Sequence, residues 1–209
     1  MGLFSLLFGG KTKAQSSGNL REIALNEFLG QYVPTNCIKA SPETIEKYKN
    51  KVPDALIKLW KSNGFGKYNN GLIEIINPDD FNKTLWTWLG KEVANYVPIA
   101  INGFGDLFYY RKLTESDEDV CVIEPHYRDI TTCAWSLDLF FNDYLCHKTT
   151  IEHLLREDLF YEAIGKYGEL YKNEIFYFAP ALGIGGSEEL KNIKKGNAQI
   201  HLDILFQLY

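Results

Sequence analysis

Short apolar runs rich in Ile, Val, Phe and Tyr occur along this chain without the strand–helix–strand repeat of a parallel sheet, and this feature constrains the fold most. The runs are bounded by Gly, Asp or Pro, which is typical of strands. No internal repeat is present. The pattern therefore predicts an α+β fold, an antiparallel sheet flanked by helices, rather than a doubly wound fold. The predicted strands are residues 72–76, 98–101, 107–113 and 120–124.

Helix starts are well marked in the sequence. Ser41-Pro42 and Asn77-Pro78 each place a capping side chain before a proline at the first helical position. Residues 149–152, Thr-Thr-Ile-Glu, fit a capping box that opens a longer helix ending near Gly165 or Gly168. Further helices are predicted at residues 20–29, 53–64 and 136–145.

The last third of the chain is predicted to add a strand at residues 175–178, a glycine-rich turn and a short helix. In the turn, residues 183–187, Ser187 would cap a helix beginning at Glu188, and the acids Glu188 and Glu189 would repel a phosphate there. Residues 199–208 alternate apolar and polar side chains, which predicts a final strand with one buried face. The four tryptophans, Trp60, Trp86, Trp88 and Trp135, are predicted to lie in the core.

The first ten residues, MGLFSLLFGG, are similar to a targeting signal but lack the features that define one. There is no basic region before the apolar run, and the run is far below the roughly 20 residues of a membrane span. Leu6 stands where myristoylation requires Ser or Thr. Gly10-Lys11-Thr12 imitates a phosphate-binding loop, but the first glycine of that motif would fall at Ser5. We expect residues 1–19 to be a flexible leader, with no membrane span.

Charge argues against direct nucleic-acid binding, and the acidity is concentrated in one segment that has two interpretations. The net charge is −5 and the pI about 5.4, too acidic for a protein that grips phosphates. Residues 113–143 hold eight acidic residues and one basic residue, Arg128. A local negative field of this kind attracts a basic partner and speeds association, although a solvated hairpin loop would have the same composition.

The sequence contains no recognisable catalytic or metal-binding motif, so we expect no cofactor and no metal. The four cysteines are widely spaced, which favours free thiols in a reducing cytoplasm. The four histidines form no known signature. Cys121, His126, Cys133, Cys146 and His147 could supply zinc ligands, but they lack the close pairs of structural zinc sites.

Two blocks of sequence carry a family resemblance. The first block comprises VPDAL at 52–56, LW at 59–60, NGFGKY at 63–68, GL at 71–72, NP at 77–78 and FGD at 104–106. The second comprises GEL at 168–170, NEIFYF at 173–178, PALGIGG at 180–186, NI at 192–193 and HLDIL at 201–205. The first block resembles the GAD-like domain of bacterial immunity proteins, and the second resembles the small C-terminal domain that accompanies it. After the leader at residues 1–19, the resemblance implies a GAD-like α+β domain at 20–135 and a C-terminal immunity-type α+β domain at 136–209.

The resemblance implies a cytoplasmic immunity protein of the type VI secretion system that binds and neutralises a cognate DNase toxin and carries no catalytic residues. Two modes of inhibition stay open, plugging of the catalytic cleft and disruption of the toxin fold. Because a DNase must present a cationic surface to DNA, we predict that acids steer binding and nearby tyrosines anchor it. The predicted contact residues are Glu115, Asp117, Glu118, Asp119, Tyr109, Tyr110 and Tyr127.

Two other function classes stay open at this point. The chain could be a regulatory or scaffold protein that binds a different bacterial protein. It could also be a small enzyme that uses carboxylates, with Asp106 working beside His126. The toxin's identity and the oligomeric state are not predicted by the sequence.

Overall fold

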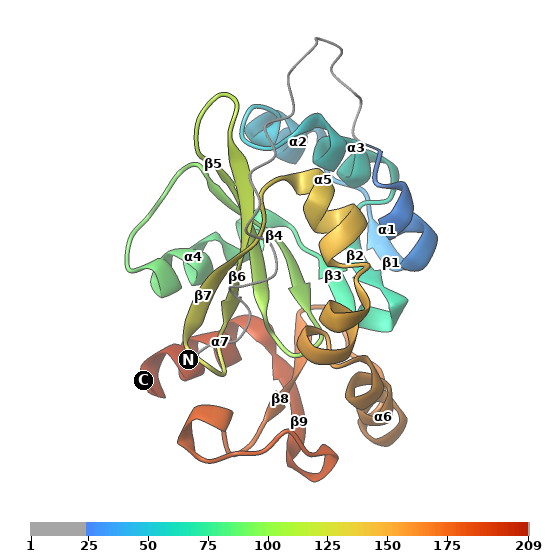
Figure 1. Ribbon diagram of the computed structural model, residues 1–209, viewed down its shortest axis with the longest axis vertical. Coiled ribbons are helices and arrows are strands. Elements are labelled where there is room, and N and C mark those ends of the chain that lie inside the picture. The colour runs from blue at the N-terminus through green and yellow to red at the C-terminus, as the bar shows by residue number, and fades with distance from the viewer. Residues whose placement is uncertain (1–23, 209) are drawn as a thin grey trace.

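A seven-stranded antiparallel sheet forms the centre of the molecule, and each strand pairs with its neighbours in chain order (Figure 1). The structure is a computed structural model that describes residues 24–208, so the predictions for the leader and the first helix before residue 24 lie outside the described residues. The strands are β1 (Pro34–Ile38), β2 (Phe65–Tyr68), β3 (Ile73–Ile75), β4 (Tyr96–Asn102), β5 (Leu107–Lys112), β6 (Glu118–Glu124) and β7 (Asp129–Ala134). The predicted α+β class and antiparallel sheet are confirmed.

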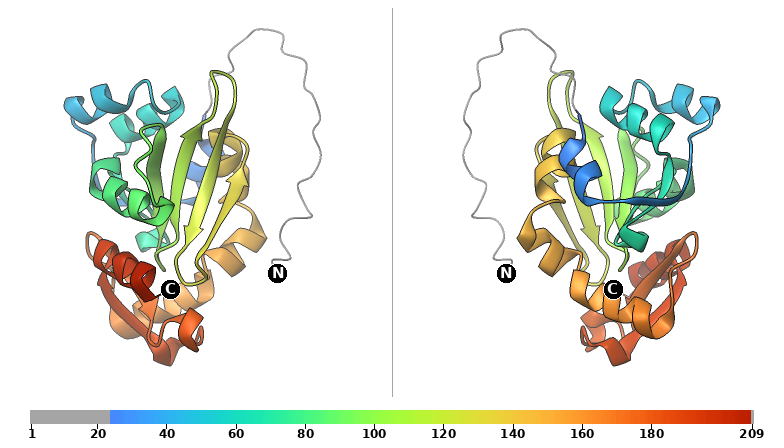
Figure 2. Two further views of the ribbon diagram at one scale, coloured as in Figure 1. Left: turned by 90° about the vertical axis from the view of Figure 1, so that its left-hand side faces the viewer. Right: turned by 90° about the vertical axis from the view of Figure 1, so that its right-hand side faces the viewer.

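Helices cover both sides of the sheet. Figure 2 shows α1 and α5 on one side and α2, α3 and α4 on the other. The Ser41 hydroxyl accepts a hydrogen bond from the Thr44 N–H, and the Asn77 amide oxygen accepts one from the Asp79 N–H, so both predicted caps are confirmed. The helices are α1 (Asn26–Gln31), α2 (Pro42–Tyr48), α3 (Asp54–Ser62), α4 (Pro78–Leu89), α5 (Leu137–Leu139), α6 (Glu157–Tyr167) and α7 (Ala198–Leu208).

A two-stranded sheet and α7 lie at one end of the large sheet (Figure 1). The predicted strand at 175–178 is confirmed as β8 (Glu174–Phe178), which pairs with β9 (Ile193–Asn197). The Phe176 N–H donates to the Gly103 carbonyl at 2.8 Å, which ties β8 to the β4–β5 turn. Two apolar cores result. The larger contains side chains of α1, α3, the central strands and residues 137–163, and the smaller lies between the sheet, α4 and α7.

The predicted final strand is wrong, because residues 198–208 form helix α7. Ala198, Leu202 and Leu205 are buried at helical spacing, and the Asn197 side chain accepts a hydrogen bond from the Ile200 N–H at 3.0 Å. The alternating pattern placed Leu202 together with Ile200 and Ile204, but the latter two are exposed. Ala198, Leu202 and Leu205 follow the i, i+4, i+7 spacing of one helical face, and packing against α4 decides in favour of this pattern over the alternating one.

Three further predictions need correction. The helix predicted from the capping box is broken at Arg156, which has φ 52°, into a π-helical segment, Thr150–Leu154, and α6. The Thr149 side chain makes no capping hydrogen bond. No helix begins at Glu188, where the chain instead forms a 3-10 turn at Leu190–Asn192. Trp135 is 65 % exposed, whereas Trp60 and Trp88 are buried as predicted.

Candidate partner-binding surfaces

The acidic turn between β5 and β6 exposes only part of its predicted contact set. The Glu115 side chain is 94 % exposed and pairs with Lys112 Nζ at 2.8 Å. Asp117 is also exposed, and its carboxylate accepts a hydrogen bond from the Thr114 hydroxyl at 2.8 Å. These two carboxylates are the ones that the turn exposes to solvent.

The other two predicted acids serve the fold. Asp119 is fully buried and receives two hydrogen bonds from the Arg111 guanidinium, at 2.7 and 2.6 Å. The Glu118 carboxylate accepts hydrogen bonds from the Tyr110 hydroxyl at 2.8 Å and from the Leu137 N–H at 2.9 Å. Arg111 and Lys112 therefore neutralise part of the charge, and the field at this turn is weaker than the sequence count implies.

The predicted tyrosine anchors do not surround the acidic turn. Tyr109 and Tyr110 are 1 % and 3 % exposed and pack in the two apolar cores. Tyr127 is 54 % exposed, but it follows the far end of β6, about 20 Å away at about 3.3 Å per residue. Alternate side chains of a strand point to opposite faces of the sheet, and here helices cover both faces. The aromatic residues of β5 are therefore core residues.

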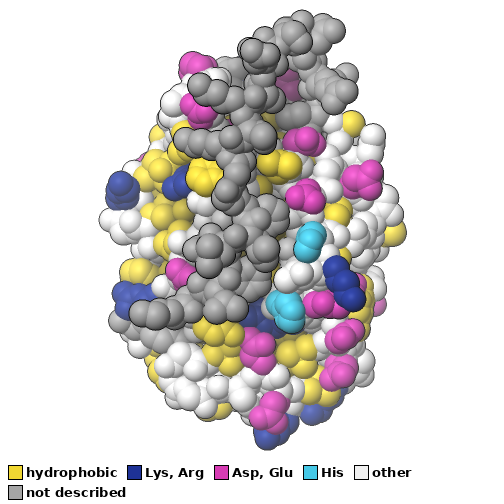
Figure 3. Space-filling model, viewed as in Figure 1, with side chains coloured by type: hydrophobic (Ala, Val, Ile, Leu, Met, Phe, Trp, Pro, Cys, Tyr) yellow, Lys and Arg dark blue, Asp and Glu magenta, His cyan; other side chains and the backbone are white. Residues whose placement is uncertain are grey.

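A larger acidic surface lies over the elements from α5 to α6. Figure 3 shows acidic side chains gathered over this part of the molecule. Lys148, which lies 3.4 Å from a Glu152 oxygen, is an exposed base among them. We call this surface the acidic face; its exposed carboxylates are Asp138, Asp143, Glu152, Asp158 and Glu162. Only Asp138 and Asp143 belong to the acidic segment that the sequence predicted. The recurrence of acidic residues after residue 143 is the signal that could have indicated the other three carboxylates.

Exposed apolar side chains border the acidic face. Trp135 precedes Ser136, the N-cap of α5, and Leu139 lies in that helix and is 47 % exposed. Tyr161 on α6 is 39 % exposed. A tryptophan that is mostly exposed carries a large area that a partner could bury, and such residues are frequent hot spots of protein interfaces.

A buried ionic cluster holds α6 against the sheet. The Arg156 side chain is 7 % exposed and donates to Glu188 through Nε at 3.0 Å and Nη2 at 2.9 Å. Its Nη1 lies 3.3 Å from Asp106 Oδ2, and Asp106 also accepts a hydrogen bond from Asn102 at 2.7 Å. The Tyr127 hydroxyl donates to Glu188 at 2.6 Å, so Tyr127 is a member of this cluster.

Burial and charge set the ionisation of the cluster. Burial raises the pKa of Asp106, although the Arg156 guanidinium opposes the rise. Burial also acts on Glu188, but the hydrogen bonds from Arg156 prevail and lower its pKa. Burial together with the nearby Asp106 carboxylate raises the pKa of Glu124 to about 7. The charges of these groups are therefore balanced mainly by neighbouring charges and hydrogen bonds rather than by solvent.

The alternative catalytic pair has no open access in this structure. Asp106 and His126 are each 1 % exposed. Burial and the Arg156 charge lower the pKa of His126 to about 3, and burial lowers the pKa of His201 to about 4. Both imidazoles are therefore neutral near pH 7.

The described residues show no metal-binding arrangement and no disulfide. Between residues 24 and 208, no three His, Cys, Asp or Glu side chains lie together as a metal site requires. All four cysteines are unpaired, and burial raises the pKa of the Cys121 and Cys133 thiols. Within the same part of the chain, no helix has the length and apolar character needed to cross a bilayer.

Comparisons with known proteins agree with the two-part sequence pattern. The sequence model of the GAD-like domain matches residues 20–123, and the model described as T6SS immunity protein Tdi1, C-terminal, matches residues 134–209. A comparison with curated proteins found no match. The crystal structure of Atu4351 from Agrobacterium tumefaciens is similar with a TM-score of 0.67 and 16 % identity, covering 88 % of this chain and 89 % of that one. At this identity the likeness shows the fold alone.

Proposed function

Because the chain belongs to the type VI secretion immunity proteins that join a GAD-like domain to a Tdi1-type C-terminal domain, we propose that it binds and neutralises a cognate toxin. The toxin is a DNase in this proposal, and the complex forms in the cytoplasm of the cell that makes both proteins. Protein–protein contact is the whole mechanism, and it protects the producing cell and its kin.

The acidic face is the observation that carries this proposal. A DNase surface is cationic because it binds phosphates, and the five exposed carboxylates from α5 to α6 complement such a surface. The exposed ends of Glu115 and Asp117 extend the negative field to the β5–β6 turn. Long-range attraction of this kind raises the association rate more than it lowers the dissociation rate.

Apolar anchoring area next to the acids would supply the remaining affinity. Trp135 and Leu139 border Asp138 and expose much of their surface. Burying an exposed tryptophan at the centre of an interface typically contributes about 2 kcal/mol or more. We therefore assign Trp135 the central anchor position, in place of the buried Tyr109 and Tyr110.

Inhibition of DNA cleavage by the purified protein tests the proposal. The toxin encoded beside it should lose DNA cleavage when the two are mixed in equal amounts. Trp135→Ala should weaken binding about 30-fold or more, whereas Ile200→Ala, a similarly exposed apolar residue on α7, should leave binding unchanged. Tight binding with retained cleavage would instead indicate a regulatory or scaffold protein.

The acids are tested by matched charge removal. Asp138→Asn, Glu152→Gln and Glu162→Gln together should slow association and flatten its dependence on salt. The control removes three exposed acids elsewhere, with Glu43→Gln, Glu46→Gln and Asp54→Asn. Equal effects of the two triple variants would exclude the acidic face from the interface. Hydrogen exchange of the bound toxin separates cleft plugging, which protects the cleft locally, from disruption, which exposes the toxin core.

A further inference from the structure

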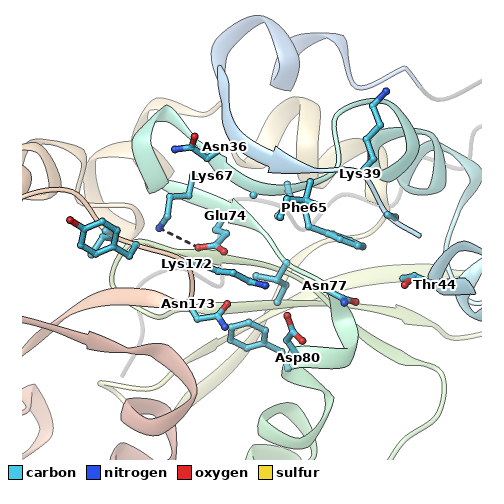
Figure 4. A pocket seen from close by; sticks show the side chains of 18 of the residues that line it. Asn36, Lys39, Thr44, Phe65, Lys67, Glu74, Asn77, Asp80, Lys172 and Asn173 are labelled. Atoms are coloured by element: carbon cyan, nitrogen blue, oxygen red, sulfur yellow. Dashed lines mark ion pairs between the residues drawn. The ribbon is translucent and has the colours of Figure 1, made fainter. Parts of the chain in front are cut away.

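A hollow on the α4 side of the sheet is separate from the acidic face. Its volume is about 450 Å³, within the range of small-molecule sites. The β1–α2 connection, the start of α4 and the loop at residues 169–173 surround it, and β2 and β3 form its floor (Figure 4). Elements from both matched sequence regions thus contribute to one cavity.

The floor of the hollow is part of a row of side chains that runs across the sheet. Lys67 on β2 pairs in register with Glu74 on β3, and Glu74 pairs with Ile101 on β4. Ile101 is buried in the smaller core under α4 and α7, so this row faces the α4 side. The row is therefore apolar beneath the helices and charged in the hollow.

Lys67 is the unusual residue of this hollow. It is 8 % exposed, and no acceptor among the described residues is in hydrogen-bonding geometry with its Nζ. The nearest carboxylate, Glu74 Oε2, lies 3.4 Å away, longer than the roughly 2.8 Å of a strong charged hydrogen bond. A Cβ at Gly71, where φ is +102°, would lie 3.3 Å from Nζ, so this glycine makes room for the ammonium group.

Such a pair is costly unless another group completes its hydrogen bonds. Both side chains are about nine-tenths buried, and desolvation of two charges outweighs their attraction when donors and acceptors stay unused. Burial raises the pKa of Glu74, and the Lys67 and Lys172 ammonium groups oppose that rise. Lys67 Nζ therefore lacks an acceptor in hydrogen-bonding geometry, and a bound carboxylate would supply one.

The rest of the lining has balanced charge and some apolar surface. Figure 4 shows Lys172 and Asp80 close to the Lys67–Glu74 pair. The lining holds three lysines and three acids, so neither a cation nor an anion is favoured overall. Ile38 and Phe65 supply apolar surface. The polar lining also includes three carboxamides: Asn36, Asn77 and Asn173.

We propose that this hollow binds a small zwitterion of the amino-acid or dipeptide class. The ligand carboxylate accepts hydrogen bonds from Lys67 Nζ, and the ligand ammonium group donates to the Glu74 carboxylate. The apolar part of the ligand lies against Ile38 and Phe65. This site is independent of the toxin contact, since the acidic face lies over α5 to α6 and shares no residue with the hollow.

Thermal unfolding of the full chain with the twenty amino acids and a set of dipeptides tests the site. A binding ligand at tenfold its Kd should raise the Tm by about 4 °C. N-acetylation or C-terminal amidation of that ligand should each abolish most of the shift. Absence of any shift across the set at about 10 mM, well above a Kd of about 1 mM, would overturn the proposal, and so would an equal shift from the doubly blocked compound.

Variants and a measurement on the unaltered protein locate the site. Lys67→Met and Glu74→Gln should each weaken binding at least about tenfold. Lys112→Met, which alters a lysine paired with Glu115 at the β5–β6 turn, away from the hollow, should not. If a variant fails to fold, NMR of the parent protein decides: ligand should shift the methyl signals of Ile38 and Ile76, which line the hollow. Two results would overturn the small-ligand assignment. One is that the ligand shifts only the signals of methyl groups elsewhere in the protein, and the other is that the toxin, and no small ligand, protects the hollow.

Discussion

Replacing Glu124 with glutamine should stabilise the protein at neutral and alkaline pH but not at acid pH. Glu124 ends β6 beside the buried ionic cluster. Burial and the Asp106 carboxylate raise its pKa from an ordinary value of 4.5 to about 7. The ionised form is therefore disfavoured in the folded state, and a glutamine side chain at this position would mimic the neutral form without the charge.

The sign of the effect follows from proton binding in the two states. Below about pH 4.5 the carboxyl group is protonated in both states, so the substitution changes little. As pH rises from 4.5 to 7 the unfolded state loses its proton first, and the free energy of unfolding of the parent protein falls. The full shift corresponds to about 3 kcal/mol, and we expect about 1–2 kcal/mol because Glu124 keeps some contact with solvent.

Urea denaturation of the parent and the Glu124→Gln variant near pH 5 and pH 8 measures this difference. The variant should exceed the parent in free energy of unfolding near pH 8, and most of the gain should vanish near pH 5. Glu92→Gln, at an exposed position, is the control. An advantage of the variant that is equal at both pH values would refute the reasoning, since a packing effect does not titrate.

Four further substitutions test the fold itself. Arg156→Met should lower the free energy of unfolding by about 3–5 kcal/mol in urea denaturation, because it leaves the buried Asp106 carboxylate without its cation. Gly103→Ala should destabilise the protein, since its Cβ would lie 2.3 Å from a Phe160 ring carbon. Gly165→Ala in α6, with open space around it, should raise the free energy of unfolding by about 0.5–1 kcal/mol. Equal Tm values of the two variants would contradict this packing. Asn197→Ala should cost about 1 kcal/mol by loss of the α7 cap, measured in the same way, with an unchanged stability counting against that cap.

Local chemistry made much of the fold predictable. The Ser41 and Asn77 caps act within three residues, and β4, β5 and β6 are runs of β-formers joined by turns. These elements can be predicted from the sequence because their determinants lie inside them. β1 begins with Pro34 and β2 contains Gly66, so neither has the composition of a strand, and pairing with neighbours forms them.

The candidate contact surface was less predictable because exposure depends on tertiary structure. The sequence places Tyr109 and Tyr110 near acidic residues, but helices on both sides of the sheet bury both rings. Trp135 is of a residue type that is usually buried, and yet it is mostly exposed, because the chain leaves the edge strand β7 at this point. The ionic cluster joins residues 50 and 32 positions apart around Arg156, which no spacing rule connects.

The two proposed sites should differ in their response to salt because they differ in charge. The acidic face carries an excess of one sign, and its field extends about one Debye length, roughly 10 Å at 0.1 M salt. The charges around Lys67 and Glu74 cancel within the hollow, so recognition there depends on short contacts. Raising NaCl from about 50 to 500 mM should slow toxin association at least about tenfold but change zwitterion affinity less than about twofold. Surface plasmon resonance and calorimetry measure the two quantities, and equal salt dependence would contradict the division of charge between the two sides of the sheet.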